Sequence, residues 1–190
     1  MYKKQIRILG IDDSPFTLED KECLVIGTFF RGGVQLDGVL STKVAVDGED
    51  ATSNLIQMIN KSKFQSQIQA ILLDGIAVGG FNVINIENLA KHTKIPVIVV
   101  VRQMPDFEEL HKTLGKLGME KKYALMEKAG TPQPVGMSLG TVHIQMAGVT
   151  FDKAQEIIRL SSLFSSIPEP LRVAHLIGAG IVRGESSGGA

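Results

Sequence analysis

Runs of apolar residues divide the chain into segments with the periods of strands and helices. The first run, Ile6 to Ile11, is rich in β-branched residues and stops abruptly at a pair of aspartates, which is typical of a buried strand. Strand-like runs follow at Glu22 to Phe30 and at Val34 to Val46, with an Arg-Gly-Gly turn between them. The N-terminal part therefore predicts a three-stranded antiparallel meander, in which the first and third strands end at the same edge of the sheet.

Helical and strand patterns alternate after the meander. A helix is predicted over Ala51 to Asn60, with Asp50 or Thr52 as its N-cap. Short strands are predicted at Ala70 to Leu73 and at Ile95 to Val101, and crossover connections should make them parallel to a neighbour. Further helices are expected at 83–92, 106–116, 121–129, 150–163 and 171–178, a loop at 131–134, and an extended segment around 141–146. This order predicts an α/β three-layer fold with a mixed sheet and flanking helices that resembles ribonuclease H.

Composition limits the class of protein. The chain has 190 residues, 44% of them hydrophobic, with 20 basic and 20 acidic side chains. We expect a single domain over 1–183 and a disordered Gly/Ser-rich tail over 184–190. A zero net charge means that a nucleic-acid partner would be held by a local basic patch. The lone Cys23 is expected in the core, and the absence of a signal peptide or membrane-spanning run predicts a cytoplasmic protein with no membrane partner.

Three predicted strands deliver charged residues to one edge of the sheet. Asp12 follows the first strand, the acids of Asp47-Gly48-Glu49-Asp50 follow the third, and Asp74 follows the fourth. Converging carboxylates without a His/Cys cluster favour Mg²⁺ or Mn²⁺ over zinc. Such ions promote in-line displacement at phosphorus, so phosphodiester hydrolysis fits best. Arg102 would hold a phosphate, and His143 would shuttle a proton or hold a water molecule.

Each of these residues also has a purely structural interpretation. The aspartates after the first strand are common turn residues before a proline, a strand-terminal arginine is usually solvated, and a single histidine is more often packed in a core. The glycine-rich segment Gly75 to Asn82 lacks the spacing of a nucleotide-binding fingerprint. It is interpreted as a flexible loop that lets nucleic acid approach, in which Phe81 either stacks on a base or simply packs.

Several segments carry a family resemblance. Ile8 to Asp12 resembles the first acidic strand of the endonuclease V family, and Ile71 to Ala77 resembles its central aspartate-glycine motif. Ile95 to Arg102 resembles the strand that ends in a lysine, and Val142-His143 the glycine-histidine element. The segment Ile167 to His175, which contains Pro-Glu-Pro, is the closest match. The resemblance runs from about Gln5 to Ile177 and is strongest to an archaeal relative of unknown function, also called endonuclease dU.

The resemblance implies a metal-dependent endonuclease that cuts DNA near a deaminated base. Asp12 and Asp74 would then be metal ligands, and Asp50 would replace the family's glutamate, with Asp47 and Glu49 as alternatives. Arg102 and His143 would occupy the positions of the lysine and the histidine. The segment Ile167 to His175 is interpreted as a structural signature, because proline at a helix start is a capping device. The family's aromatic wedge has no counterpart around Ser41-Thr42-Lys43.

The sequence leaves two other functions open. One is a non-catalytic nucleic-acid-binding module of the same fold, which the missing wedge and the neutral charge would favour. The other is a phosphohydrolase of small nucleotides, since the same carboxylates can hold a triphosphate through Mg²⁺. Both differ from the endonuclease in whether an oligonucleotide is cut.

Overall fold

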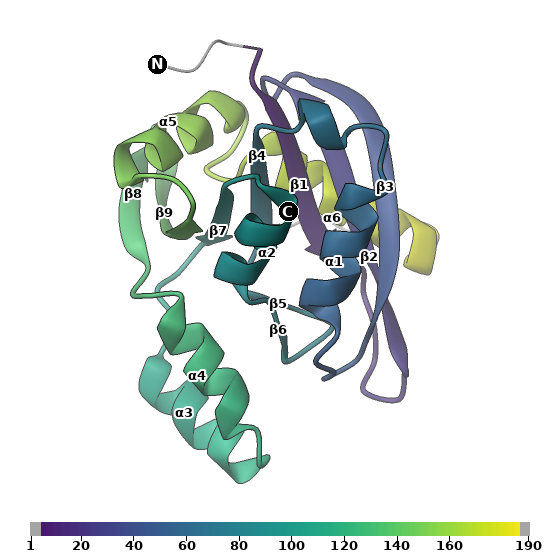
Figure 1. Ribbon diagram of the computed structural model, residues 1–190, viewed down its shortest axis with the longest axis vertical. Coiled ribbons are helices and arrows are strands. Elements are labelled where there is room, and N and C mark those ends of the chain that lie inside the picture. The colour runs from purple at the N-terminus through teal and green to yellow at the C-terminus, as the bar shows by residue number, and fades with distance from the viewer. Residues whose placement is uncertain (1–4, 187–190) are drawn as a thin grey trace.

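The computed structural model describes residues 5–186, and within them seven strands form one mixed sheet (Figure 1). The strand order is β3-β2-β1-β4-β7-β9-β8. The β1–β4 and β4–β7 pairs are parallel, and the other neighbours are antiparallel. The bounds are β1 Arg7–Asp13, β2 Glu22–Arg31, β3 Gln35–Ala45, β4 Ala70–Asp74, β7 Val97–Val101, β8 Gln133–Met137 and β9 Gly140–Ala147.

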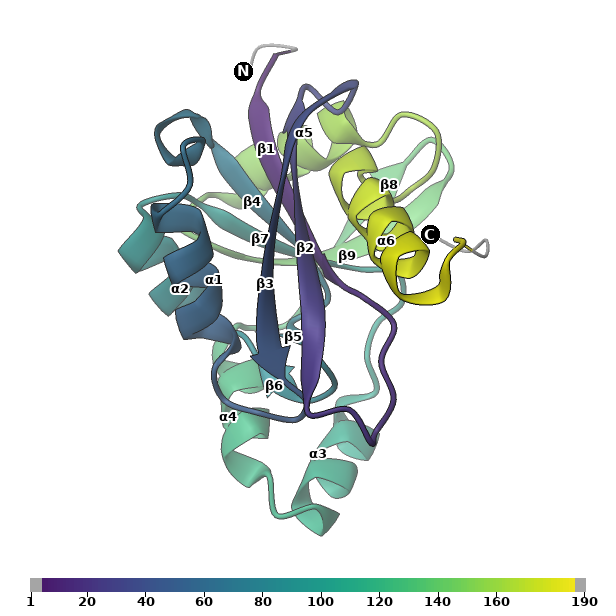
Figure 2. The ribbon, with the colours of Figure 1, turned by 90° about the vertical axis from the view of Figure 1, so that its right-hand side faces the viewer.

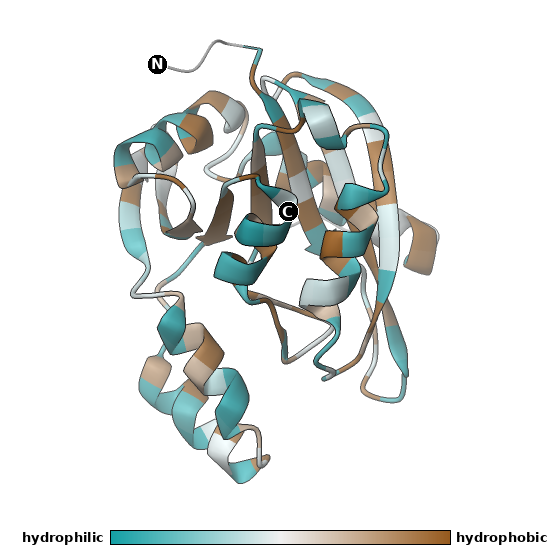
Figure 3. Ribbon diagram, in the orientation of Figure 1, coloured by the Kyte–Doolittle hydropathy of each residue, from teal (hydrophilic) through white to brown (hydrophobic). Residues whose placement is uncertain are grey.

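Helices cover both faces of the sheet, which makes three layers (Figure 2). One face is covered by α1 (Ala51–Asn60) and α2 (Ile86–Thr93), and the other by α5 (Phe151–Ser161) and α6 (Glu169–Arg183). The strands alternate their side chains between two apolar clusters, one under each pair of helices. Figure 3 shows the resulting pattern, with hydrophobic residues concentrated on the central strands and hydrophilic ones on the outer sides of the helices.

Two smaller elements lie beyond the end of β4 and β7. A hairpin of β5 (Ala77–Val78) and β6 (Asn82–Val83) follows β4 directly. Helices α3 (Phe107–Lys116) and α4 (Glu120–Lys128) form a helical hairpin between β7 and β8, and both views show it projecting from the body (Figures 1 and 2). We call α3, α4 and their connection the arm.

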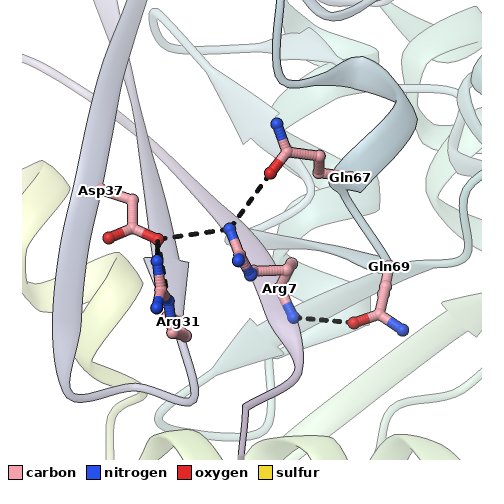
Figure 4. Close-up of polar contacts among 5 residues, drawn as sticks. All are labelled: Arg7, Arg31, Asp37, Gln67 and Gln69. Atoms are coloured by element: carbon pink, nitrogen blue, oxygen red, sulfur yellow. Dashed lines mark hydrogen bonds and ion pairs between the residues drawn. The ribbon is translucent and has the colours of Figure 1, made fainter.

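The far end of the sheet, where β1 begins, is closed by complementary charges (Figure 4). Asp37 Oδ2 accepts hydrogen bonds from Arg31 at 2.9 Å and from Arg7 at 3.3 Å. The Arg7 side chain also donates to Gln67, from the 3₁₀ turn Gln65–Gln67, at 3.2 Å, and its backbone N–H donates to Gln69 at 3.0 Å. These contacts join β1, β2, β3 and the chain that leads into β4.

Most element boundaries agree with the sequence-based predictions, and four differ. The predicted loop at 131–134 overlaps β8, where Pro134 is tolerated because β8 is an edge strand. The helix predicted from 83 begins at Ile86, because Asn82–Val83 pair with β5 and Asn85 caps α2 by accepting from the Asn88 N–H. The last helix continues past 178 to Arg183, where Gly184 ends it with a φ of 83°.

The fourth difference concerns the glycine-rich segment. The predicted flexible loop, Gly75 to Asn82, is instead largely the β5–β6 hairpin, and Phe81 packs against an apolar cluster under the arm. Of the predicted disordered tail, 184–186 are described, and 187–190 lie outside the described residues. No helix in residues 5–186 is both long and apolar enough to cross a membrane.

Candidate active site

Asp12 and Asp74 lie side by side at the carboxyl end of the sheet. The register of the parallel β1–β4 pair aligns Ile11 with Leu73, so the next residue of each strand is one of these aspartates. Even-numbered residues on both strands, such as Ile8 and Leu72, face the cluster under α5 and α6. Strand alternation therefore brings both carboxylates to the α6 face of the sheet.

Helix α6 lies directly over this part of β1. The Thr28 hydroxyl of β2 donates to the Pro170 carbonyl at 2.6 Å. A side chain at Gly10 would meet the Pro170 backbone at 2.4 Å, so the close approach requires glycine at this position. The contact places His175, about one and a half turns further along α6, with its Nδ1 3.0 Å from Asp12 Oδ2.

His175 is the site residue that sequence reasoning missed. The segment Ile167 to His175 was interpreted as a structural signature, and that interpretation is incomplete because its last residue contacts a buried acid. Two signals were present in the sequence: the histidine closes the segment with the strongest family resemblance, and it follows the helix-starting prolines.

The electrostatics of the site are dominated by buried acids that repel one another. Burial, then the charges of Asp74 and Asp13, raise the pKa of Asp12 to about 8. Burial also raises the pKa of Asp74, against the opposing effects of Arg102 and His175. An isolated aspartate in water would be fully ionised at neutral pH. A positive charge beside these two carboxyls would favour their ionised forms.

Asp13 lies next to the same acids, but strand alternation directs its side chain to the opposite face of the sheet from Asp12. Its Oδ2 accepts the Gly79 backbone N–H at 2.6 Å, which ties β1 to the β5–β6 turn. Burial raises the pKa of Asp13, and the Gly79 hydrogen bond opposes this effect. Asp13 therefore has a structural role, although through the distant Gly79 and not through the predicted turn, whereas Asp12 faces the acid of the neighbouring strand.

Arg102 follows β7 at the edge where the acids lie. It is solvent-exposed, and its charge lowers the pKa of both Asp12 and Asp74. The structure thus brings this predicted residue to the acids. An exposed guanidinium beside carboxylates is suited to a phosphate that enters the site from solvent.

His143 lies on the opposite face of the sheet from Asp12 and Asp74. It pairs with Val101, whose side chain packs against the cluster under α1 and α2. Its neighbours Val142 and Ile144 face the α5 and α6 side, as strand alternation requires. The His143 Nδ1 is buried and has no hydrogen-bond partner in the described part of the chain. The structure therefore does not bring His143 to the acids.

Asp50 lies at the start of α1 and is held by neighbouring polar groups. Its carboxylate accepts the Ala45 backbone N–H at 3.1 Å, the Asn82 side chain at 2.6 Å and the Asn54 side chain at 2.9 Å. It is the N-cap residue of α1 by position but makes no capping hydrogen bond, and the Ala51 N–H donates to Asn82 instead. These contacts give Asp50 a scaffolding role in the β3–α1 connection.

The other two candidates for the middle acid also differ in their surroundings. Asp47, with a φ of 51°, accepts the Phe81 N–H at 2.7 Å, and Glu49 is exposed. In residues 5–186 no three His, Cys, Asp or Glu side chains are arranged to hold a metal ion. The structure thus brings Asp12, Asp74 and Arg102 together and adds His175, while the third predicted acid is engaged elsewhere.

The fold is an α/β fold with a mixed sheet and flanking helices, similar to that of endonuclease V structures. Human ENDOV matches with a TM-score of 0.60 at 16% identity, over 95% of this chain and 85% of that one. An endonuclease V from Ciona intestinalis, solved with a 24mer DNA containing an inosine followed by a ribo-adenosine, has a TM-score of 0.58 at 14% identity, over 90% of this chain and 83% of that one.

The chain belongs to the endonuclease dU family, whose model matches residues 4–182. A UPF0215 protein of Methanothermobacter thermautotrophicus is 49% identical over 99% of this chain and 93% of the relative. A crystal structure of a protein of unknown function from Archaeoglobus fulgidus has a TM-score of 0.84 at 38% identity, over 94% of this chain and 99% of that one. The predicted membership of an archaeal, endonuclease V-like family is confirmed.

Proposed function

We propose that the protein is a metal-dependent endonuclease that hydrolyses a phosphodiester near a deaminated base, uracil or hypoxanthine, in DNA, as a step of DNA repair. The observation that carries the proposal is the pair of adjacent carboxyls, the buried Asp12 and the half-buried Asp74, at the carboxyl ends of parallel strands. Ligands of open α/β sheets bind beyond these ends. The family and the DNA bound by a structural neighbour support the choice of substrate.

The donor set fits a hard divalent cation. Burial raises the pKa of both carboxyls, and repulsion by Asp74 and Asp13 adds to this effect at Asp12. A bound cation would favour the ionised form of each. Asp12 and Asp74 would hold Mg²⁺ or Mn²⁺, whereas Asp50, the third ligand that the resemblance implies, is held by Ala45, Asn54 and Asn82. When bound, the ion supplies charge neutralisation at the phosphate and activation of the attacking water.

The remaining side chains act on the substrate and on the protons. Arg102 binds the phosphate from the exposed side of the site. His175 orients Asp12 through Nδ1, and its ring can take or give a proton at the same edge, the role that the sequence had suggested for His143. His175 is half-buried, so solvent can exchange protons with it.

We also propose that the architecture is the ribonuclease H-like one. The antiparallel β1–β2–β3 succession followed by strands parallel to β1 supports this assignment. A DNA-repair role would place the protein in the cytoplasm, and the free, buried Cys23 is compatible with a reducing compartment.

The test is cleavage of end-labelled oligonucleotides, single- and double-stranded, that contain uracil, hypoxanthine or no lesion. With Mg²⁺ or Mn²⁺ the wild type should cut a lesion strand. The Asp12→Asn and Asp74→Asn variants should lose at least about 10³-fold in rate, because each removes a carboxylate that would hold the cation. The matched control is Asp37→Asn, which changes an equivalent carboxyl at the far end of the sheet.

Cutting without a divalent ion, or undiminished cutting by Asp12→Asn, would overturn the proposal. Binding without cutting under all conditions would leave the non-catalytic binding module. Hydrolysis of free nucleotides in preference to oligonucleotides would instead favour the phosphohydrolase.

A further inference from the structure

The arm is fixed against the loops that surround the candidate active site. Leu114 and Met126 of the arm form an apolar cluster with Val83 of β6, and Phe81 packs on it. The Lys122 side chain is buried, and its Nζ donates to the Asp47 carbonyl at 2.5 Å. The arm therefore has a defined orientation relative to the hairpin that directly follows Asp74.

The arm also extends outward from the end of the sheet that carries the acids. It begins five residues after Arg102, and the figures show it projecting past β5 and β6 (Figures 1 and 2). The ten residues of α3 span about 15 Å at 1.5 Å per residue. The apex of the arm, around Leu117, thus lies about 15 Å further along the arm than the start of α3.

The charges of the arm are unevenly distributed along its length. Asp106, Glu108 and Glu109 lie at its base, where the first turn of α3 begins. Lys112, Lys116 and Lys121 lie within five residues of Leu117, are exposed, and form no ion pair with any residue in 5–186. Glu120 is the one acid among the exposed residues from Lys112 to Lys121, so this apex is locally basic.

Lys112 and Lys116 share one side of α3. They are four residues apart, and both lie about 200° around the helix from the buried Leu114. The chain as a whole has zero net charge, and its candidate site is lined by acids that repel phosphate. A phosphate polymer must therefore be attracted by local cations outside the acid cluster.

We propose that the arm is a nucleic-acid-binding element, in which Lys112, Lys116 and Lys121 contact the sugar-phosphate backbone of the substrate beside the cut site. This inference rests on the proposed function and adds a second contact surface to it. Given a rise of about 3.4 Å per base pair, an arm about 15 Å long reaches phosphates roughly four or five base pairs from the scissile bond. The contacts are electrostatic and read no sequence.

The experiment measures binding of a uracil-containing DNA duplex of about 24 base pairs by fluorescence anisotropy, without divalent ions, over a range of salt concentrations. The triple variant Lys112→Ala/Lys116→Ala/Lys121→Ala should weaken binding at least about tenfold near 0.1 M salt. It should also reduce the slope of log K against log salt by up to about 0.9 for each lysine removed.

The matched control is Lys61→Ala/Lys91→Ala/Lys153→Ala. These lysines are also exposed, and they lie near the other end of the sheet, after α1, within α2 and at the start of α5. The control removes the same charge, so it should leave the salt slope close to the wild-type value. Both variants change only exposed side chains, and matching thermal unfolding curves will show that both fold.

Duplexes shortened to about three base pairs on one side of the lesion or the other locate the contact. On one of the two shortened duplexes, the wild type and the arm variant should bind with equal affinity. An unchanged salt slope, an equal loss in the control variant, or a difference that persists on both short duplexes would overturn the proposal. If the wild type cuts lesion DNA and the arm variant binds DNA with the same affinity as the wild type, only the arm proposal fails. If the wild type binds no nucleic acid, both proposals fail.

Discussion

Strand β1 begins at Arg7 and ends at the pair Asp12 and Asp13, and the protein surrounds the charges at these two ends differently. At the beginning, Arg7 and Arg31 share the carboxylate of Asp37, and Gln67 satisfies a further donor (Figure 4). At the end, Asp12 faces the acid of the neighbouring strand, and burial and repulsion raise its pKa to about 8.

The charges at the first end are satisfied within the protein, whereas those at the second end are not. A charge cluster whose partners complement one another stabilises the fold on its own. Adjacent buried carboxyls destabilise it, and they persist only where the surrounding structure holds them in place. Here α6, tied to β1 and β2 through Pro170, supplies that constraint. The proposed cation would offset the charge of this end.

Substitution by asparagine at Asp12 and at Asp37 should change the free energy of unfolding in opposite directions. The pKa of Asp12 rises from 3.8 in the unfolded chain to about 8 in the folded protein. Between these values the folded state holds more protons than the unfolded state, so the free energy of unfolding falls as pH rises through this window. Asp12→Asn removes the penalty and should stabilise the metal-free protein above pH 8 by an amount on the order of 2 kcal/mol.

Asp37→Asn should destabilise by about 1 kcal/mol, because two partly exposed arginines lose their shared carboxylate. Urea unfolding at about pH 5 and pH 8.5 measures both variants. The gain in Asp12→Asn should shrink at the lower pH, where the wild-type carboxyl is protonated. A loss of stability in Asp12→Asn at the higher pH would show that the acids do not repel one another.

Substitution of the two histidines, His175 and His143, should lower the cleavage rate to different extents. His175→Ala removes the side chain that contacts Asp12, and we expect cleavage to fall by about 10- to 100-fold, the usual range for a residue that orients a metal ligand. His143→Ala should leave the cleavage rate within about threefold, since His143 faces the other side of the sheet. Single-turnover rates at saturating Mg²⁺ make the comparison. The reverse order would restore the histidine assignment suggested by the family resemblance.

Substitution of Asp50 has the smallest expected effect, and it tests whether Asp50 belongs to the proposed metal site. As a scaffold it stabilises the β3–α1 connection, so Asp50→Asn should cost about 1 kcal/mol of stability and leave the affinity for Mn²⁺ unchanged. As a metal ligand it would behave like Asp74→Asn and abolish Mn²⁺ binding. Unfolding curves and Mn²⁺ titration of the same samples distinguish these roles.

Sequence patterns were sufficient for the strands that carry the acids. Buried apolar runs located β1, β4 and β7, and the parallel arrangement brought Asp12, Asp74 and Arg102 to one edge. His175 could not be placed in the same way, because its contact depends on how closely α6 crosses β1 at Gly10. His143 was misplaced because the face of a strand residue depends on the β7–β9 register, which the sequence does not reveal.

The chain between Asp47 and Asn82 shows another limit. Its glycines and acids are compatible with an open loop and a metal ligand, and both were predicted. In the folded protein Asn82 is completely buried and donates to Asp50, while Asp47 accepts from the β5–β6 turn. Hydrogen bonds between segments more than 30 residues apart decide this arrangement, and local patterns carry no information about them.

The most direct test of the proposed cation site at the end of β1 is calorimetric titration of the metal-free protein with Mn²⁺ at about pH 8. The wild type and Asp37→Asn should bind Mn²⁺ with the same affinity and release protons as they do so, because a carboxyl that is partly protonated must ionise to hold the ion. Asp12→Asn and Asp74→Asn should not bind it. Equal Mn²⁺ binding by wild type and Asp12→Asn would contradict the account.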